Sequence, residues 1–219
     1  MKSYQQYCSV ARALDVVGDR WVLLIVRELL AFGPSRYSDL KRGLPGIASN
    51  LLAERLRTME ADGLVERHDA PAPIGTGVYQ LTERGRELED VLRALTRWGL
   101  PTMPSGPTER DAVQPQWGAL LAGLTLPSTM PAGTEVVIGI DTGTESIGVS
   151  LREDGFDIVR GPGTGTDVTL QGPAVLVGGL LSGLLTVADA TKSGLTITGR
   201  ADVLAELVDD NRAHTGVTP

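Results

Sequence analysis

The first third of the chain carries apolar side chains at helical spacing. The pattern predicts one helix over residues 8–17 and a second over 19–31, separated by Gly18. The apolar positions that define the second helix are Trp21, Leu24, Ile25 and Leu29. Asp19 stands where a side chain can cap the start of this helix.

A short helix and a longer one follow. The run SRYSDLKRGL predicts a small helix that ends near Gly43, and Gly63 stops the next helix. On the longer helix one side carries Leu52, Leu56 and Met59, the side roughly opposite carries Asn50, Glu54 and Arg57, and Ala53 lies on the flank. Because Arg55 lies nearer the apolar side, we expect it to act within the molecule.

Two strand-like runs come next, LVERHD and GVYQL. Residues 70–76 between them are too many for a two-residue hairpin and predict a projecting loop. Two helices joined by a tight turn and followed by a ribbon is the order of a winged helix-turn-helix, whose second helix enters the DNA major groove. Cations suit the phosphates, and Arg and Asn read base edges. The candidate DNA-binding residues are Arg36, Tyr37, Ser38, Ser49, Asn50, Ala53, Glu54, Arg57, Arg67 and His68.

These segments resemble the HxlR family of bacterial winged-helix regulators. The runs that carry the resemblance are YCSVARALDVVGDRWVLLIVREL, RYSDLKRGLPGIASNLLAERLRTMEADGLV and YQLTERGREL. It covers about residues 7–100 and implies a DNA-binding homodimer that acts on a nearby promoter. One departure is Ala48, where the family often has a hydroxyl residue, which leaves Ser49 as the candidate helix cap.

An apolar stripe runs along the helical stretch 82–99. Its members are Leu88, Val91, Leu92, Leu95 and Trp98. The stripe could pack on its own domain, but in the HxlR family the final helix pairs with its twin. The resemblance therefore favours a homodimer interface here.

The pattern changes after residue 100, and this divides the chain. Prolines and polar residues predict a linker over 103–115, between a domain over 1–102 and a second domain over 116–214. In the second domain a helix precedes three strands that form an antiparallel meander. A fourth strand, a helix over 174–188, a fifth strand and a final helix follow, so the fold class is α+β.

This order resembles the sterol carrier protein-like fold, most closely in DVTLQGPAVLVGGLLSG and SGLTITGRADVLAEL. The resemblance spans residues 116–210 and implies an apolar cavity between sheet and helices. The candidate ligand-binding residues are Val149, Phe156, Ile158, Leu176, Leu180 and Leu184.

Two glycine-containing loops imitate phosphate-binding motifs. In EVVIGIDTGTESIGVSL the Asp-Thr-Gly-Thr run resembles the hairpin of actin-like ATPases, but the chain after Asp141 is too short for their second lobe. We interpret it as a turn with Gly143 at positive φ. GPGTGTD, residues 161–167, lacks the following helix that would hold an anion, and we interpret it as a loop.

Charge and cysteine content narrow the function. The net charge is −7, yet residues 1–100 carry 14 Lys and Arg against 13 Asp and Glu, and the remainder 6 against 14. The acidity therefore lies in the second half and does not oppose DNA binding by the first. One cysteine and two histidines predict no metal site, and no nucleophile–base pair or cofactor loop predicts an enzyme.

No membrane span is predicted either. The uncharged run 168–188 contains Pro173, lacks basic or aromatic anchors, and suits a buried helix. No signal peptide opens the chain, so we expect a cytoplasmic protein without a cofactor.

Three hypotheses follow. The first is a homodimeric regulator, more plausibly a repressor, that reads a pseudo-palindromic operator under the control of a hydrophobic or amphipathic small molecule in the C-terminal domain. The second is a redox-responsive regulator switched at Cys8, with a structural C-terminal domain. Cys8 begins the first helix, where unpaired N–H groups favour the thiolate, although a free cysteine is more often a small buried hydrophobe. A lipid-carrier module is the third.

Overall fold

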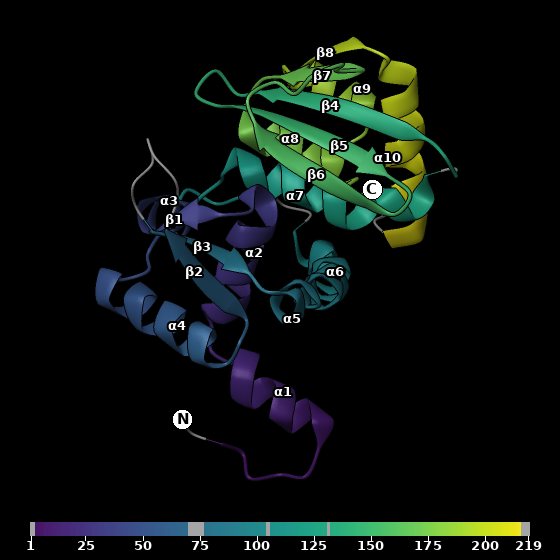
Figure 1. Cartoon of the computed structure of the whole chain (residues 1–219). Coiled ribbons are helices and arrows are strands. Elements are labelled where there is room, and N and C mark those ends of the chain that lie inside the picture. Colours follow the sequence, from purple (N-terminus) through teal and green to yellow (C-terminus); the bar gives the residue numbers. More distant parts are fainter. Residues whose placement is uncertain (1–2, 70–76, 104–105, 131, 216–219) are drawn as a thin grey trace. The chain divides into compact units, whose positions relative to one another are not determined.

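A computed structural model of the chain describes residues 3–69, 77–103, 106–130 and 132–215 (Figure 1). The chain divides into two compact units, Met1–Leu92 and Arg93–Pro219. The predicted linker 103–115 is thus grouped with the second unit. The predicted loop 70–76 lies outside the described residues. Each unit is described separately.

The first unit is built from helices and a small sheet. Its elements are α1 (Ser9–Val17), α2 (Val22–Phe32), β1 (Ser35–Arg36), α3 (Tyr37–Gly43), α4 (Ser49–Ala61), β2 (Val65–Asp69), β3 (Gly77–Leu81), α5 (Glu83–Arg86) and the first residues of α6 (Leu88–Gly99). The strands are antiparallel in the order β1-β3-β2. The helices and the ribbon confirm the predicted order, and β1 is an addition, because a two-residue strand leaves no periodic signal.

The core of this unit lies where α2 and α4 bury their apolar sides. Ile25 and Leu29 of α2 are buried, and so are Leu52, Leu56 and Met59 of α4, as the spacing predicts. Each large aliphatic side chain removed from water contributes about 1.5–3 kcal/mol to folding. These contacts hold the amphipathic α4 in place and leave its polar side outward.

The predicted continuous helix over 82–99 is wrong, because the structure has two helices. Thr82 caps the short α5 by accepting a hydrogen bond from the Gly85 N–H at 3.0 Å. Gly85 lies so close to β2 that a Cβ there would be 2.0 Å from the Leu64 carbonyl oxygen. The first turn is thereby held against the start of the ribbon, and the longer α6 begins only after Glu87.

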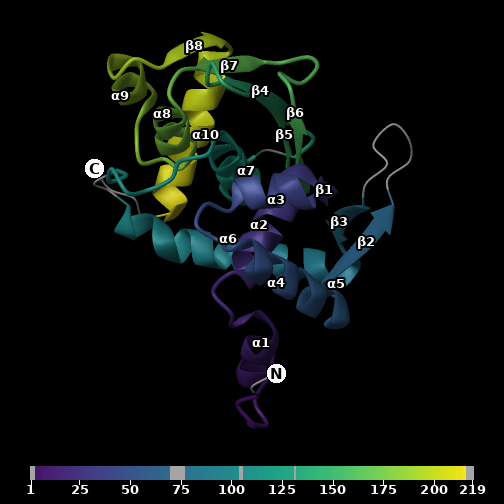
Figure 2. The same cartoon turned by 90° about the vertical axis from the view of Figure 1, so that its left-hand side faces the viewer.

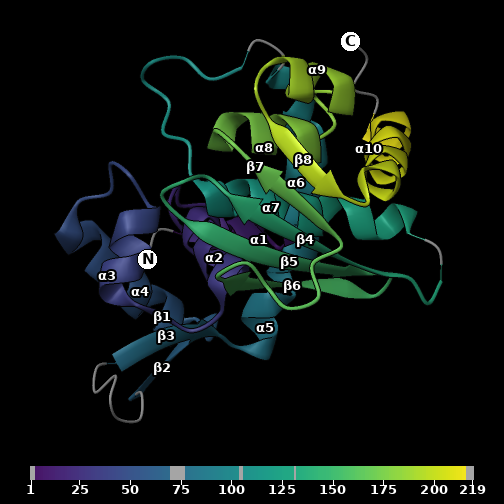
Figure 3. The same ribbon diagram turned by 90° about the horizontal axis from the view of Figure 1, so that it is seen from above.

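The second unit combines a five-stranded sheet with helices. Its elements, after the end of α6 and the 3-10 turn η1 (Leu100–Thr102), are α7 (Pro115–Thr125), η2 (Leu126–Thr129), β4 (Glu135–Asp141), β5 (Ser146–Arg152), β6 (Gly155–Arg160), β7 (Val168–Gln171), α8 (Ala174–Leu181), α9 (Val187–Lys192), β8 (Thr196–Gly199) and α10 (Ala201–Thr215). The order across the sheet is β6-β5-β4-β7-β8, which Figure 3 shows from above. The meander β4-β5-β6 confirms the prediction, and β7 joins β4 in parallel.

Helices α7, α8 and α10 gather on one side of this sheet (Figure 2). Helix α7 packs on β5 and β6, and α8 packs on α7. A Cβ on Gly118 of α7 would stand 3.2 Å from the Gly178 Cα of α8. The absence of a side chain at Gly118 lets the two helix backbones approach closely.

The predicted helix over 174–188 is also wrong, because it is divided into α8 and α9. Gly183 has a φ of +78°, which a helix cannot continue through. Ser182 stabilises the break by donating to the Gly179 carbonyl oxygen at 3.0 Å. Thr186 then caps α9 by accepting from the Asp189 N–H at 3.0 Å. Among the described residues no helix has the length and apolarity needed to cross a membrane.

Both glycine-containing loops are structural, as predicted. Asp141 pairs with Ser146 across the β4-β5 hairpin, and the Gly143 N–H donates to the Asp141 carboxylate at 2.8 Å. Gly143 has a φ of +78°, the conformation expected of a turn glycine. The loop 161–167 leads into strand β7 and not into a helix.

Candidate nucleic-acid interface

Helices α3 and α4 are joined by side-chain hydrogen bonds that span the turn between them. The Tyr37 hydroxyl, at the start of α3, donates to the Ser49 carbonyl oxygen at 2.6 Å. The Lys41 ammonium donates to the Ile47 carbonyl oxygen. Because the side chains of Leu44 and Ile47 are buried beneath these bonds, the turn is held from both sides.

The first residue of α4 is Ser49, and Ala48 occupies the N-cap position without a side-chain hydrogen bond. The expectation that Ser49 caps the helix is therefore wrong. The helix starts one residue earlier than a Ser49 cap requires, so the serine is already inside it. With alanine at the cap, no side chain at that position satisfies the first backbone N–H groups of α4, which are the kind of group that binds phosphate.

The outward side of α4 presents the residue types that read bases. Asn50, Glu54 and Arg57 are exposed, whereas Ala53 is half-buried. The Arg57 Nε–H donates to the Ala53 carbonyl oxygen at 3.3 Å, so this guanidinium lies along the helix surface. Arg57 has no carboxylate partner among the described residues, and its charge is open to a ligand.

Arg55 differs from Arg57 in its partners. It forms an ion pair with Asp19 at 2.6 Å and a second with Glu54 at 3.1 Å, and only 21% of its side chain is exposed. The pKa of Asp19 is lowered: burial alone would raise it, but hydrogen bonds from Arg55 and from the Trp21 N–H outweigh burial. The predicted intramolecular role of Arg55 is confirmed.

The ribbon carries Arg67 and His68, both exposed. Strand register sets Arg36 and His68 opposite Val78, and sets Arg67 opposite Tyr79. Since neighbours in register point to the same side of a sheet, Arg36 and His68 share one face and Arg67 lies on the other. The Arg67 guanidinium lies 5.9 Å from the centre of the Tyr79 ring.

His68 stands beside a carboxylate. Its Nε2 is 3.1 Å from a Glu66 carboxylate oxygen, and the Gln80 amide donates to the same carboxylate at 2.6 Å. The hydrogen bond from Gln80, and then that from His68, lower the pKa of Glu66. The negative charge of Glu66 offsets any positive charge on His68, so the positive charge of Arg67 is the more available one on the ribbon.

The cations around α3 are unequally available. Arg42 pairs with Asp39 at 2.9 Å, and Lys41 is engaged with the turn. Arg36 is exposed at the end of β1, and among the described residues its side chain forms no hydrogen bond or ion pair. Ser38 is exposed as well, whereas Tyr37 is half-buried by its bond to Ser49.

Exposed apolar side chains mark two helices. On α6, Val91, Leu95 and Trp98 are exposed to 40%, 43% and 79%, while Leu92 is buried and Leu88 half-buried. Beside and on α1 the exposed apolar residues are Tyr7, Val10 and Leu14. The spacing of this second set indicates one helix face, a signal that the sequence reasoning above did not use. Cys8, the N-cap residue of α1, is exposed too.

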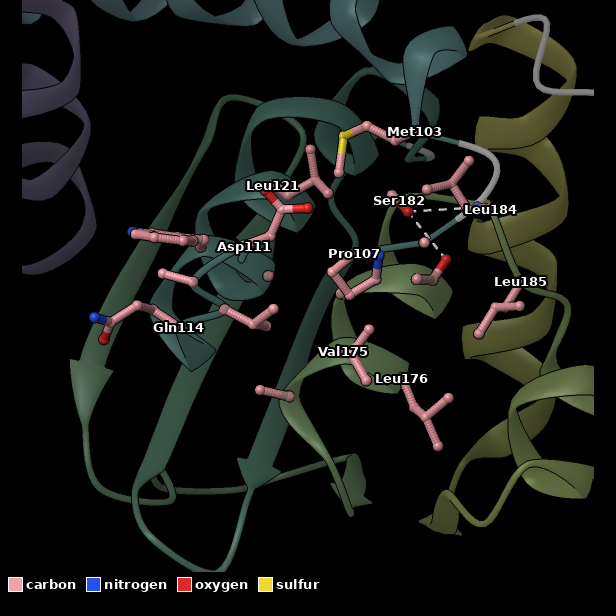
Figure 4. A pocket seen from close by; sticks show the side chains of 18 of the residues that line it. Met103, Pro107, Asp111, Gln114, Leu121, Val175, Leu176, Ser182, Leu184 and Leu185 are labelled. Atoms are coloured by element: carbon pink, nitrogen blue, oxygen red, sulfur yellow. Dashed lines mark hydrogen bonds between the residues drawn. The ribbon is translucent and has the colours of Figure 1, made fainter. Parts of the chain in front are cut away.

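The second unit contains a pocket of about 660 Å³, which Figure 4 shows from close by. It lies among α7, α8 and residues within 102–103 and 106–114, and not between the sheet and the helices as expected. Leu176 and Leu184 line it. The other four candidates, Val149, Phe156, Ile158 and Leu180, do not line it. Val149 and Leu180 are fully buried core residues, and the Phe156 ring packs on Gly123, where a Cβ would come within 2.4 Å of it.

Comparison with known proteins concerns mainly the first unit. The sequence profile described as HxlR-like helix-turn-helix matches residues 16–106. The chain is 36% identical over 87 residues to the HTH-type transcriptional regulator YvaP of Bacillus subtilis, covering 40% of this chain and 80% of YvaP. It is 43% identical over 102 residues to Rv3095 of Mycobacterium tuberculosis, also described as an HTH-type transcriptional regulator, covering 45% and 63%. A crystal structure of the regulator YtcD matches with 36% identity and a TM-score of 0.40, covering 43% of this chain and 96% of YtcD.

Proposed function

This chain belongs to the HxlR-like helix-turn-helix family and is a DNA-binding transcriptional regulator, and from that premise we propose that it is a homodimeric repressor controlled by a small molecule. In this proposal α4 enters the major groove of the operator. The observation that carries it is that the two arginines of α4 have different partners. Arg55 is neutralised by Asp19, whereas the neighbouring Arg57 faces outward without a carboxylate.

The proposed DNA contacts fall into two groups. Asn50 and Arg57 contact base edges, because both side chains suit bidentate hydrogen bonding to purines. Arg36 and Arg67 bind phosphates and position the protein, since the structure leaves both without a carboxylate partner among the described residues. The remaining proposed contacts line the same elements and are Tyr37, Ser38, Ser49, Ala53, Glu54 and His68.

The dimer is proposed to form through α6. Its stripe of Leu88, Val91, Leu92, Leu95 and Trp98 includes three well-exposed large apolar residues, which a lone globular unit rarely leaves in water side by side. A two-fold dimer would present two copies of α4 to a pseudo-palindromic operator. Binding there would occlude a promoter, and so repress it.

Control is proposed to come from the second unit. Its α+β order and five-stranded sheet support a sterol carrier protein-like fold, and the pocket of about 660 Å³ is of the size that small ligands occupy. A hydrophobic or amphipathic effector bound there would alter operator affinity. Oxidation at Cys8 is the second candidate control, favoured by the exposure of this thiol at the N-cap of α1.

The proposal is tested by selecting bound sequences from random DNA and titrating the full chain with the selected operator. We expect a two-fold related sequence, an affinity that falls steeply with salt, and dimers in gel filtration. Selection of a single half-site by a monomer would contradict the dimer. Absence of any preferred sequence would contradict base reading by α4.

A further inference from the structure

The pocket of the second unit is enclosed on one side by the segment that follows α6. Residues within 102–103 and 106–114 line it together with α7, α8 and the turn after α8. Most of these walls are apolar, and the apolar residues that line the pocket include Met103, Pro107, Trp117, Leu121, Val175 and Leu185. In Figure 4 the labelled side chains of Met103, Pro107, Leu121, Val175 and Leu185 surround the same space. A ligand here would replace water against aliphatic and aromatic surfaces, so its body must be apolar.

The described residues that line the pocket carry negative charge only. Among the described lining residues Asp111 is the one with an ionisable side chain, and none of them is Lys, Arg or His. One Asp111 carboxylate oxygen, Oδ2, accepts hydrogen bonds from the backbone N–H and the hydroxyl of Thr108, at 2.7 and 2.8 Å. The backbone hydrogen bond from Thr108, and to a smaller extent the one from its hydroxyl, lower the pKa of Asp111. The carboxylate is therefore ionised at neutral pH. Its second oxygen, Oδ1, accepts no hydrogen bond from the described residues.

The Asp111 carboxylate lies beside an apolar space and has one oxygen without a hydrogen bond from the described residues. It should therefore distinguish amphiphiles by the charge of their head groups. Asp111 is exposed to solvent, so a head group beside it would stay hydrated, and an anionic head would be repelled by the carboxylate. A positively charged head would meet an opposite charge and could also approach the Trp117 ring. The net charge of −6 carried by residues 93–219, from 8 Lys and Arg against 14 Asp and Glu, acts in the same direction.

We propose that this pocket binds a lipophilic monocation, with its apolar body between α7 and α8 and its positive head at Asp111. The inference rests on the proposed small-molecule control and names the chemical class of the effector. The ligand would join α7 and α8 to the lining residues within 102–103 and 106–114, which follow α6 in the chain from the end of the 3-10 turn η1 onward. Occupancy would therefore add contacts to described residues that lie close in the chain to the proposed dimer helix.

Gly178 offers a way to fill the pocket without disturbing its walls. It lines the pocket, yet a Cβ placed on it would have no heavy atom within 4 Å. A leucine there would occupy the ligand's space, and it suits a helix better than glycine does. Gly178→Ala is the matched control, because it adds one methyl group at the same backbone position.

The test measures binding of three ten-carbon probes to the full chain by calorimetry, below their micellar concentrations. The probes are decyltrimethylammonium, decanol and decanoate. We expect the cation to bind more tightly than decanoate by about fivefold or more, the scale of one partly exposed charge pair. Asp111→Asn, which retains an oxygen for Thr108, should remove this preference. Glu109→Gln changes the charge of the same segment outside the lining and should leave it unchanged.

Three results would overturn the inference. The first is equal binding of all three probes, and the second is tighter binding of decanoate than of the cation. The third is cation binding by the Gly178→Leu variant that is as tight as binding by the Gly178→Ala variant. Circular dichroism and thermal melts of each variant confirm that it is folded. Operator affinity is measured in the same samples. If operator binding is intact but the probes do not bind, only the proposed class of effector is contradicted. If the protein has no affinity for the operator, the proposed function itself is contradicted.

Discussion

Arg55 of α4 and Asp19, which precedes α2, form an ion pair of 2.6 Å. The pair joins the proposed recognition helix to the helix behind it by a charge contact in addition to the apolar core. It also removes one arginine from the surface available to DNA. The outward positive charge of α4 is therefore concentrated at Arg57, two residues further on.

The Asp19–Arg55 pair makes stability depend on pH in acid. Because the folded-state pKa of Asp19 is lowered, its contribution is complete above the unfolded value, about 3.9. It is lost as pH falls through the folded-state value. We expect Asp19→Asn to lower the free energy of unfolding by about 0.5–1 kcal/mol at pH 7. Urea titrations should show this difference shrinking below about pH 4. Asp209→Asn, on the exposed side of α10, is the control; an undiminished difference at low pH would contradict the assignment.

Arg57→Ala should weaken operator binding and relax sequence preference at one base position. The expected loss is about 1–3 kcal/mol, because a bidentate contact to one base is removed. Arg67→Ala should instead weaken all sequences alike and reduce the salt dependence. Fluorescence anisotropy with the operator and its single-base variants distinguishes the two. Unchanged operator affinity in Arg57→Ala would exclude α4 as the base-reading helix.

Tyr37→Phe removes the hydroxyl that donates to the Ser49 carbonyl oxygen at 2.6 Å. We expect the free energy of unfolding to fall by about 0.5–1.5 kcal/mol, the net value of one hydrogen bond. Operator affinity should fall as well, because this bond sets the start of α4 relative to α3. Chemical denaturation and operator titration measure the two effects. Tyr4→Phe, at an exposed hydroxyl, should change neither, and a neutral Tyr37→Phe would show that the apolar turn suffices.

Trp98→Glu should dissociate the proposed dimer. The side chain is 79% exposed, so the folded protomer loses little, while a buried interface would lose a large aromatic contact and gain a charge. We expect a cost of about 2 kcal/mol or more in dimer stability, the scale of an interface hot spot. Analytical ultracentrifugation measures it. Val159→Glu, at another exposed apolar position, is the control, and a dimer that survives Trp98→Glu would place the interface elsewhere.

Cys8 allows a decisive test of redox control, since it is the single cysteine of the chain. If the thiol is a switch, diamide or a quinone should release operator DNA and Cys8→Ser should abolish that release. An intersubunit disulfide would appear as a dimer on a non-reducing gel. Mass spectrometry confirms modification. Modified protein with unchanged operator affinity would leave ligand control as the remaining proposal.

Periodicity in the sequence was sufficient to predict the winged helix-turn-helix order. The apolar residues of α4 recur at helical spacing, and so Leu52, Leu56 and Met59 could be assigned to the core before any partner was known. Glycine and proline placed the turns for a similar reason, because their effect on the backbone is local. The interpretation of Asp141–Thr144 as a turn belongs to this class.

Contacts between distant residues could not be read in this way. A helical pattern shows which face is apolar but not what covers it, so the exposure of Val10 and Leu14 on α1 emerged only from the fold. Register between strands separated Arg67 from Arg36 and His68, although the sequence shows all three only as basic residue types. The division of the predicted helix at Gly183 likewise depended on a backbone conformation that glycine permits but does not require.

The pocket is the clearest case. Its described lining comes from residues within 102–103, 106–121 and 174–185. These segments are far apart in the chain, and the cavity is the space left after α7 and α8 have packed. The sequence shows that Val149, Leu176, Leu180 and Leu184 are all apolar, but it does not show which of them face a cavity. Packing placed Val149 and Leu180 in the core and left Leu176 and Leu184 at the cavity. A cavity is a property of how surfaces fit together, and that fit depends on every long-range contact at once.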